Sequence, residues 1–323
     1  MCTRSGLLLI ILLFSDVATS FETLPVIIWH GMGNLMPKNI YFLSTGDHAK
    51  GGGIRQLGEV VQQMIPGTQV KCIATSQSDA EDIEDSYFKP IDIQISQVCN
   101  ELLSDPVFRD GVHMIGLSQG GLFVRALAQR CPFKKIGAVV SIGGPQMGVF
   151  GVPKCRDIGP IHWCFVMDKL LSYGAYSSLV QQHLVQAQYW HDPLKEETYR
   201  EKCQFLPDIN QERVSANPTG FAEISQLINS TYRDNLLKVK HLVLVRFADD
   251  TVLKPKESEW FGYFDDMTLD KFHSLQETEM YKKDWLGLKR LDETGRLHFI
   301  ELEGDHLQFT LAWFKDMVAT YIS

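Results

Sequence analysis

The sequence feature that most constrains the fold is the pentapeptide Gly116-Leu117-Ser118-Gln119-Gly120, in which a serine stands between two glycines. An apolar run from Val112 to Leu117 precedes it, and a run with helical periodicity from Gly121 to Gln129 follows it, which predicts a strand and then a helix. This context fits the G-x-S-x-G nucleophile elbow, whose strained turn exposes a serine hydroxyl at a helix N-terminus. Ser118 is therefore the candidate nucleophile; the alternative is a plain turn between a strand and a helix.

Further runs along the chain predict an alternation of strands and helices. Strands that alternate with helices favour a mostly parallel sheet with helices on both faces. The other predicted strands are Leu24–Trp29, Gln69–Ala74, Ile136–Ile142, Lys240–Phe247 and Leu297–Leu302. The other predicted helices are Gln56–Met64, Ile91–Leu103, Ser178–Trp190 and Gln308–Tyr321.

The segment at about 146–235 differs from the rest, since it is rich in Tyr, Trp, Gln and His and carries short helical patterns without convincing strands. We interpret it as a cap-like helical insertion over the carboxyl ends of the strands, where sites of α/β proteins lie. The rival interpretation is a separately folding domain, but no linker-like composition bounds the segment. We therefore expect residues 21–323 to form a single domain.

The N-terminus has the features of a secretory signal peptide over residues 1–20. Arg4 precedes the apolar run Leu7–Phe14, and the small residues Ala18-Thr19-Ser20 supply a cleavage site. A membrane anchor is the alternative, but a spanning helix needs about 20 apolar residues and this run is shorter. No later stretch is long and apolar enough to cross a membrane.

Composition and motifs exclude several other classes of function. The net charge of −8 comes without a Lys/Arg cluster, which argues against nucleic-acid binding. No H-E-x-x-H or C-x-x-C motif is present, so we expect no metal site. The glycines at 51–53 lack the dinucleotide-binding order, and we expect no cofactor.

An acyl-transfer serine needs a base and a carboxylate that orients it, in the chain order Ser, Asp or Glu, His. His306 fits the base best, because it follows the strand Leu297–Leu302 and precedes the last helix. His298 lies inside that strand, and His273 lies in a polar loop with no strand leading into it.

The carboxylate follows the strand that ends at Phe247, where Asp249 and Asp250 are both within reach and spacing does not choose between them. The oxyanion requires two N–H donors. One is the backbone of Gln119, after the serine, and the other is the backbone of Met32, in the loop after the first strand. His30 in the same loop is interpreted as structural.

Six cysteines remain after the predicted signal peptide, and in an oxidising compartment they indicate disulfides. Asn229-Ser230-Thr231 is an N-glycosylation acceptor. The six cysteines are Cys72, Cys99, Cys131, Cys155, Cys164 and Cys203.

Longer motifs resemble those of the lysosomal palmitoyl-protein thioesterase family from about Leu24 to the C-terminus. The resemblance is weakest between Leu35 and Asp79, where a cysteine pair of the family is missing and the loop at about 35–54 looks longer. The motifs are "VIIWHGMGN", "GLSQGG", "RALAQRCP", "GVFGVPKC", "LVQAQYWHDPLKEE", "LPDINQER", "SEWFG", "LQET" and "EGDHLQ".

The resemblance implies an α/β-hydrolase with Ser118, Asp250 and His306 as its catalytic triad, and thus selects Asp250 over Asp249. It also implies Met32 and Gln119 as oxyanion donors. The disulfides that it implies are Cys99–Cys131 and Cys155–Cys164, whereas Cys72 and Cys203 have no family counterparts and either pair with each other or stay free.

The implied function is hydrolysis of long-chain acyl thioesters, palmitoyl above all, from cysteines of S-acylated proteins during lysosomal degradation. The expected location is the lysosome, reached by the secretory pathway, or secretion. The alternatives are a lipase-like esterase, an acyl-CoA thioesterase of the same fold, or a secreted binding protein with a decayed site. The presence of Ser118, Asp250 and His306 argues against the last.

Overall fold

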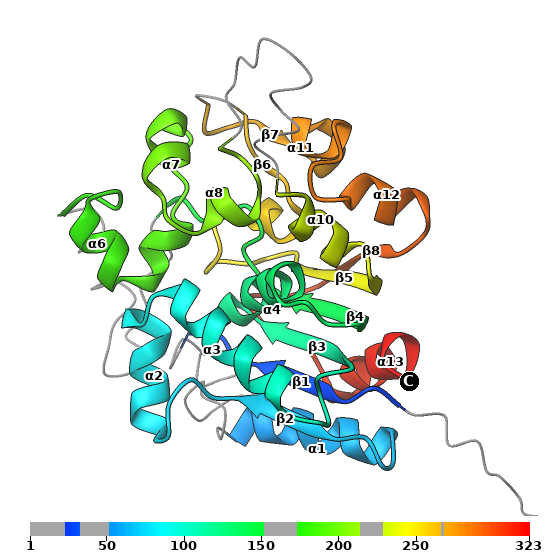
Figure 1. Cartoon of the computed structure of the whole chain (residues 1–323). Coiled ribbons are helices and arrows are strands. Elements are labelled where there is room, and N and C mark those ends of the chain that lie inside the picture. Colours follow the sequence, from blue (N-terminus) through cyan, green and yellow to red (C-terminus); the bar gives the residue numbers. More distant parts are fainter. Residues whose placement is uncertain (1–22, 33–51, 152–172, 214–228, 266–267) are drawn as a thin grey trace, which may run out of the picture.

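The structure is a computed structural model that describes residues 23–32, 52–151, 173–213, 229–265 and 268–323 (Figure 1). The predicted signal peptide, most of the altered loop at about 35–54, and the predicted Cys155–Cys164 disulfide lie outside the described residues. The same holds for parts of the predicted insertion, at residues 152–172 and 214–228.

The described residues form a parallel six-stranded sheet in the order β2-β1-β3-β4-β5-β8, which confirms the predicted mostly parallel sheet. Each predicted strand is present and its ends fall within two residues of the expected ones. The strands are β1 Val26–Trp29, β2 Val70–Ile73, β3 Gly111–Leu117, β4 Lys135–Ile142, β5 Val239–Phe247 and β8 Leu297–Leu302.

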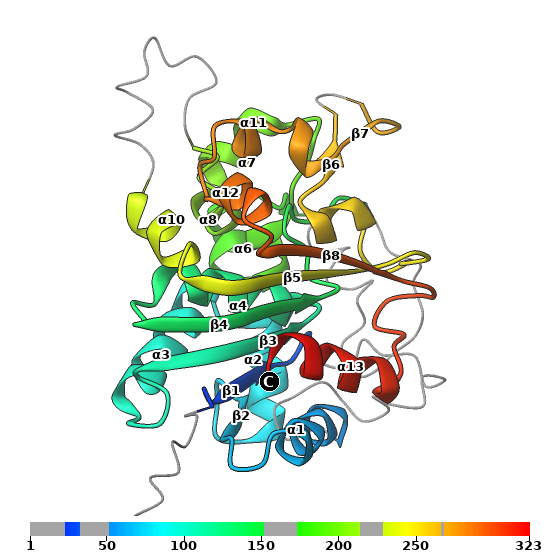
Figure 2. The same cartoon turned by 90° about the vertical axis from the view of Figure 1, so that its right-hand side faces the viewer.

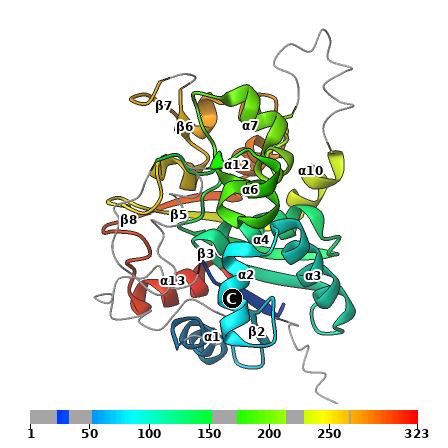
Figure 3. The same cartoon turned by 90° about the vertical axis from the view of Figure 1, so that its left-hand side faces the viewer.

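The central strands β1, β3 and β4 are buried on both faces almost throughout, and β1 shows why such a strand is a continuous apolar run. Val26 and Ile28 pack into one hydrophobic cluster, whereas Ile27 and Trp29 pack into the other, because successive side chains of a strand point to opposite faces. Figures 2 and 3 show the helices of the two faces. One face carries α1 (Gly52–Met64) and α13 (Leu311–Tyr321), and the other carries α3 (Ile91–Ser104), α4 (Gln119–Arg130) and α10 (Ser230–Leu236).

Between β4 and β5 the described residues form short helices on the side of the sheet that carries α4 (Figures 1 and 3). The single helix expected over Ser178–Trp190 is wrong: the chain turns to extended geometry at Leu184. The buried amide of Gln181 donates to the carbonyl of Ala187 at 2.7 Å, which stabilises the break. The elements are α6 Ser178–His183, the 3₁₀ helix η1 Val185–Tyr189, α7 Glu196–Lys202 and α8 Leu206–Ile209.

Several short elements were not predicted from the sequence. Most of them lie in the chain between β5 and β8 and are found near the edge of the sheet that these two strands form (Figures 1 and 2). His273, expected in a polar loop, lies in a two-residue strand. No helix in the described ranges is long and apolar enough to cross a membrane. The unpredicted elements are α2 Asp79–Phe88, η2 Lys256–Trp260, β6 Tyr263–Phe264, β7 Phe272–His273, η3 Leu275–Glu277, α11 Glu279–Lys282 and α12 Leu288–Glu293.

Candidate active site

Ser118 occupies the sharp corner between β3 and α4, with φ of 53° and ψ of −126°, a strained conformation for a residue with a side chain. The flanking glycines make the corner possible. A Cβ on Gly116 would lie 2.2 Å from the carbonyl oxygen of Gly120, and a Cβ on Gly120 would lie 2.3 Å from that of Trp29. Glycine is therefore required where the turn packs against itself and against the end of β1.

The structure brings Ser118 together with His306 and Asp250, three residues from three separate loops. Nε2 of His306 lies 2.9 Å from Oγ of Ser118, and Nδ1 lies 2.5 Å from Oδ2 of Asp250. All three side chains are buried. The ring can therefore accept the serine proton at Nε2 while Nδ1–H donates to the aspartate, which is the arrangement of a nucleophile, its base and an orienting carboxylate.

Asp250 is held as the ionised partner of His306. Its Oδ1 accepts hydrogen bonds from the backbone N–H groups of Val252 and Leu253, both at 2.7 Å. Burial raises the pKa of Asp250, but the charge and hydrogen bond of His306 outweigh it, so the pKa lies below its usual value. Asp249, the alternative, is exposed, and only Asp250 contacts the histidine.

Two further carboxylates at the site were missed by sequence reasoning. Asp305 accepts hydrogen bonds at 2.8 Å from the backbone N–H groups of Thr251 and His306, so it joins the loops that carry the base and the aspartate. Glu259, in the "SEWFG" motif of η2, accepts a hydrogen bond at 3.0 Å from the backbone N–H of Phe247. The sequence signal for Asp305 was its place beside His306.

Glu259, Asp250 and His306 also form the one group among the described residues that could hold a metal ion, with their donor atoms within 4.8 Å of one another. Both ring nitrogens of His306 already contact Ser118 and Asp250. A cation would have to displace one of these contacts, so the geometry favours proton sharing over metal binding.

Met32 and Gln119, the predicted oxyanion residues, both contact the same side chain, that of Gln186. Both are buried, and the side-chain amide of Gln186 in η1 contacts Sδ of Met32 at 2.7 Å and Oε1 of Gln119 at 3.2 Å. The hydroxyl of Tyr189 donates to the same Oε1 at 2.9 Å. Helix η1 therefore holds the side chains of both Met32 and Gln119, a role that sequence reasoning did not assign to it.

The other candidate histidines have different partners. His30 is buried and its Nε2 lies 3.1 Å from Oδ2 of Asp82, in agreement with the structural role expected for it. His298 lies 3.0 Å from His241, its neighbour on β5. His273 pairs with Asp265 at 2.7 Å.

The cysteines divide into one disulfide and two thiols among the described residues. Cys99 in α3 is bonded to Cys131 at the end of α4, as predicted. Cys72 on β2 and Cys203 after α7 are free. The sequence left open whether these two cysteines pair with each other or stay free, and the structure shows that they stay free. Burial raises the pKa of the Cys72 thiol to about 11 and that of Cys203 to about 12, so both are protonated at neutral pH and poorly nucleophilic.

Together, the parallel sheet, the serine elbow and the buried His306–Asp250 pair define a serine hydrolase of the α/β-hydrolase fold. Comparison with known proteins shows to which family within this class the chain belongs. The family model described as palmitoyl protein thioesterase matches residues 25–306, and the chain belongs to this family.

Three relatives show the extent of the similarity. Palmitoyl-protein thioesterase 1 of Caenorhabditis elegans is 38% identical over 294 residues, 91% of this chain and 90% of the relative. Palmitoyl-protein thioesterase 3 of Dictyostelium discoideum is 32% identical over 291 residues, 90% of this chain and 88% of the relative. The lysosomal thioesterase PPT2 of Homo sapiens is 34% identical over 189 residues, 58% of this chain and 56% of the relative.

Proposed function

We propose that the protein hydrolyses long-chain acyl thioesters, palmitoyl thioesters above all, on the cysteines of S-acylated proteins. The observation that carries the proposal is the contact of His306 with both Ser118 and Asp250 in a chain of the palmitoyl protein thioesterase family. Its relatives named palmitoyl-protein thioesterase, similar over nine-tenths of this chain, support the substrate class.

In the first half of the reaction, Nε2 of His306 takes the hydroxyl proton of Ser118 while Oγ attacks the thioester carbonyl carbon. The oxyanion receives hydrogen bonds from the backbone N–H groups of Met32 and Gln119. When the C–S bond breaks, the acyl group stays on Oγ and the cysteine leaves with the proton of His306. Asp250 stabilises the imidazolium that forms between these two steps.

In the second half, water attacks the acyl-enzyme carbonyl as His306 takes one of its protons. The tetrahedral intermediate collapses, Oγ of Ser118 recovers a proton from His306, and the fatty acid leaves. Every proton is moved by residues of this chain, so we propose that the reaction uses no cofactor or metal.

We further propose that the mature chain is a glycoprotein of the lysosome, delivered after removal of residues 1–20, with residues 21–323 as one domain and a cap-like insertion at about 146–235. The name of the human relative, a lysosomal thioesterase, supports the compartment. Asn229, the proposed glycan site, is exposed at the start of α10. The second proposed disulfide joins Cys155 and Cys164.

The test of the function is hydrolysis by the purified mature chain, beside Ser118→Ala, of an S-palmitoyl peptide, its oxyester analogue and palmitoyl-CoA. We expect turnover that depends on Ser118 and favours the peptide thioester. Preference for the oxyester or for the CoA substrate would contradict the proposed substrate and leave the hydrolase mechanism. If none of the three substrates were hydrolysed and a fluorophosphonate probe also failed to label Ser118, the protein would be a binding protein without a working site.

A chain-length series tests whether the acyl chain itself is recognised. Each methylene that a protein buries contributes about 0.8 kcal/mol, close to fourfold in kcat/KM. We expect kcat/KM for S-acylated peptides to rise towards palmitate and then level off. A flat profile from the shortest to the longest chain would mean that no acyl groove exists.

A further inference from the structure

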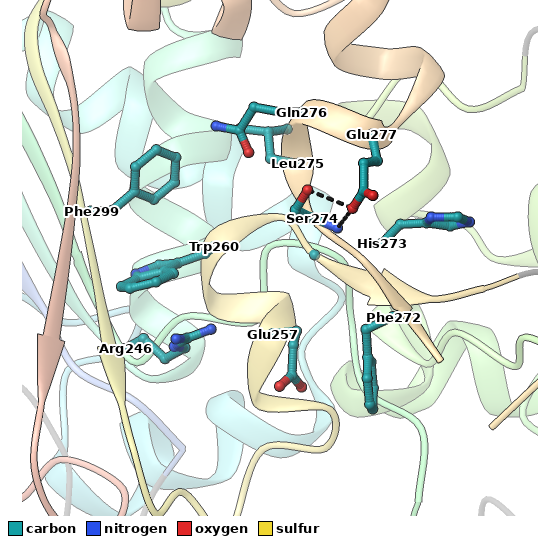
Figure 4. A pocket seen from close by; sticks show the side chains of 11 residues that line it. Arg246, Glu257, Trp260, Phe272, His273, Ser274, Leu275, Gln276, Glu277 and Phe299 are labelled. Atoms are coloured by element: carbon teal, nitrogen blue, oxygen red, sulfur yellow. Dashed lines mark hydrogen bonds between the residues drawn. The ribbon is translucent and has the colours of Figure 1, made fainter. Parts of the chain in front are cut away.

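Glu259 is a buried carboxyl group beside the triad that the mechanism above does not use. It lies on η2, where it is only 1% exposed. Its neighbours Glu257 and Trp260 line a pocket of about 500 Å³, and Figure 4 shows both side chains there. Glu259 is not among the residues that line this pocket. Glu259 therefore belongs to the interior next to Asp250.

The two oxygens of Glu259 have different surroundings. Oε2 accepts a hydrogen bond from the backbone N–H of Phe247 at 3.0 Å. Oε1 is buried and has no donor within hydrogen-bond reach, although Glu259 and Asp250 place carboxylate oxygens within 4.8 Å of each other. Two ionised carboxylates this close would repel each other, and a buried oxygen without a partner is costly. One proton on Glu259 resolves both problems.

We propose that Glu259 is a positioning residue of the triad: it is a neutral carboxylic acid whose O–H donates a hydrogen bond to Asp250. Asp250 thereby stays ionised and keeps its orientation towards Nδ1 of His306. Glu259 does not touch the substrate and acts only through Asp250. The inference rests on the function proposed for Ser118, His306 and Asp250.

The charges around Glu259 support this assignment. Burial raises the pKa of Glu259 well above its usual value, and the negative charge of Asp250 and its hydrogen bond raise it further. The N–H of Phe247 and the cation Arg246 on β5 act in the opposite direction but do not outweigh these effects. The imidazole of His306 also has a nitrogen atom within 4.8 Å of a carboxylate oxygen of Glu259, and Lys256, on the same helix η2, donates to the carbonyl of Ala248.

Glu259→Gln is the informative variant, because an amide reproduces a neutral carboxylic acid: it can donate to Asp250 and accept from Phe247. If Glu259 is neutral, this variant leaves the charge near His306 unchanged, and the acid limb of the pH–rate profile stays within about 0.3 pH units. If Glu259 were ionised, the same change would remove a negative charge near His306. The acid limb of the pH–rate profile would then move to lower pH by about one pH unit or more.

Glu259→Leu removes both hydrogen bonds at similar volume. Asp250 then loses the donor that Glu259 supplies and keeps those of Val252, Leu253 and His306, so its orientation towards His306 loosens. We expect the rate at which the fluorophosphonate probe labels Ser118 to fall about tenfold, because a displaced catalytic group slows the reaction. We also expect the acid limb to move up by about half a unit, because a carboxylate that has lost a donor attracts the proton of the histidine more strongly.

The experiment measures the rate of Ser118 labelling by a fluorophosphonate probe between pH 4 and pH 9 in the full-length mature protein. The variants are Glu259→Gln, Glu259→Leu and the matched control Glu257→Gln, which lies two residues away on η2 beside the pocket. The infrared band of a protonated carboxyl group, present in the parent and lost in Glu259→Gln but retained in Glu257→Gln, is the second readout.

An unchanged acid limb and the loss of the infrared band in Glu259→Gln, with a slower Glu259→Leu, support the proposal. A downward shift of about one unit in Glu259→Gln overturns it, and so does a folded Glu259→Leu that labels at the parent rate. If Glu259→Leu does not fold, Glu259→Gln still decides. Labelling requires no acyl substrate, so a wrong substrate class changes turnover alone and leaves this test intact.

Discussion

Asp249 and Asp250 show how one position decides the chemistry of a residue. They are adjacent after β5, yet the chain turns so that Asp249 is exposed and its backbone N–H donates to the carbonyl of Gly304 at 3.0 Å. Asp250 points inward, where its carboxylate contacts Nδ1 of His306 at 2.5 Å. Spacing along the chain does not distinguish them, because the choice depends on the turn after the strand.

We expect Asp250→Asn to lower kcat/KM by about 10³- to 10⁴-fold, because the amide cannot stabilise the imidazolium and favours the wrong tautomer of the histidine. Asp249→Asn is the matched control and should stay within about twofold, as an exposed substitution. Steady-state kinetics on the S-palmitoyl peptide, with circular dichroism to verify folding, measure both. Similar losses in the two variants would contradict the assignment of Asp250.

At the scale of elements, the sequence predicts what is repetitive and misses what depends on tertiary contacts. The central strands β1, β3 and β4 are recognisable because they are buried on two faces and are therefore mostly apolar. The edge strands β2 and β8 are only partly buried and include Lys71 and Glu301. The short elements between β5 and β8 have too few residues to establish a period. Glu259 was missed for a related reason: its partner Asp250 is nine residues away, and only the course of η2 brings the two carboxyl groups together.

Arg125 connects the elbow helix to the segment between β4 and β5. The fully buried guanidinium donates to the side-chain oxygens of Gln146 at 2.6 Å, Gln129 at 2.9 Å and Asn210 at 2.8 Å. Burial lowers its pKa to about 9, so the group remains charged at neutral pH. One cation thus satisfies three buried oxygens from α4, from the loop after β4 and from the end of α8.

Arg125→Met should therefore lower the free energy of unfolding by about 3 kcal/mol, close to 1 kcal/mol for each oxygen left without a donor. Methionine keeps most of the side-chain volume, so the loss reports the hydrogen bonds more than a cavity. Arg109→Met, at an exposed position, is the control and should change stability by less than about 0.5 kcal/mol. Urea denaturation measures both, and a loss at Arg125 below 1 kcal/mol would contradict this account.

For the molecule as a whole, two buried histidines make the free energy of unfolding depend on pH in opposite directions. His191 is stacked between Tyr199 and Tyr263, with ring centroids 3.7 and 4.0 Å away. Burial lowers the pKa of His191, but its bond and attraction to Glu196 outweigh this and leave the pKa raised. A raised folded-state pKa gives stability that is present below the unfolded value of about 6.5 and is lost as pH rises through the folded value.

His113 on β3 acts in the other direction. Its ring lies against Gly137, where a Cβ would approach within 2.3 Å, and its Nδ1 accepts a hydrogen bond from the N–H of Ala138 at 2.9 Å. Burial lowers the pKa of His113 to about 4, with a smaller effect from Lys240 and His241. The folded state therefore holds this ring neutral, and its contribution to stability is complete above pH 6.5 and declines as pH falls towards 4.

His113→Gln tests this at the scale of the whole chain, because glutamine can accept the same hydrogen bond and does not titrate. Between pH 7 and pH 4.5 the parent should lose about 2 kcal/mol of unfolding free energy through His113, which the variant does not lose. Urea denaturation at both pH values gives the difference, with the exposed His183→Gln as a control that should follow the parent. An equal loss in His113→Gln and the parent would mean that His113 does not limit stability in acid, and that other groups set the lower pH limit of an enzyme proposed to work in the lysosome.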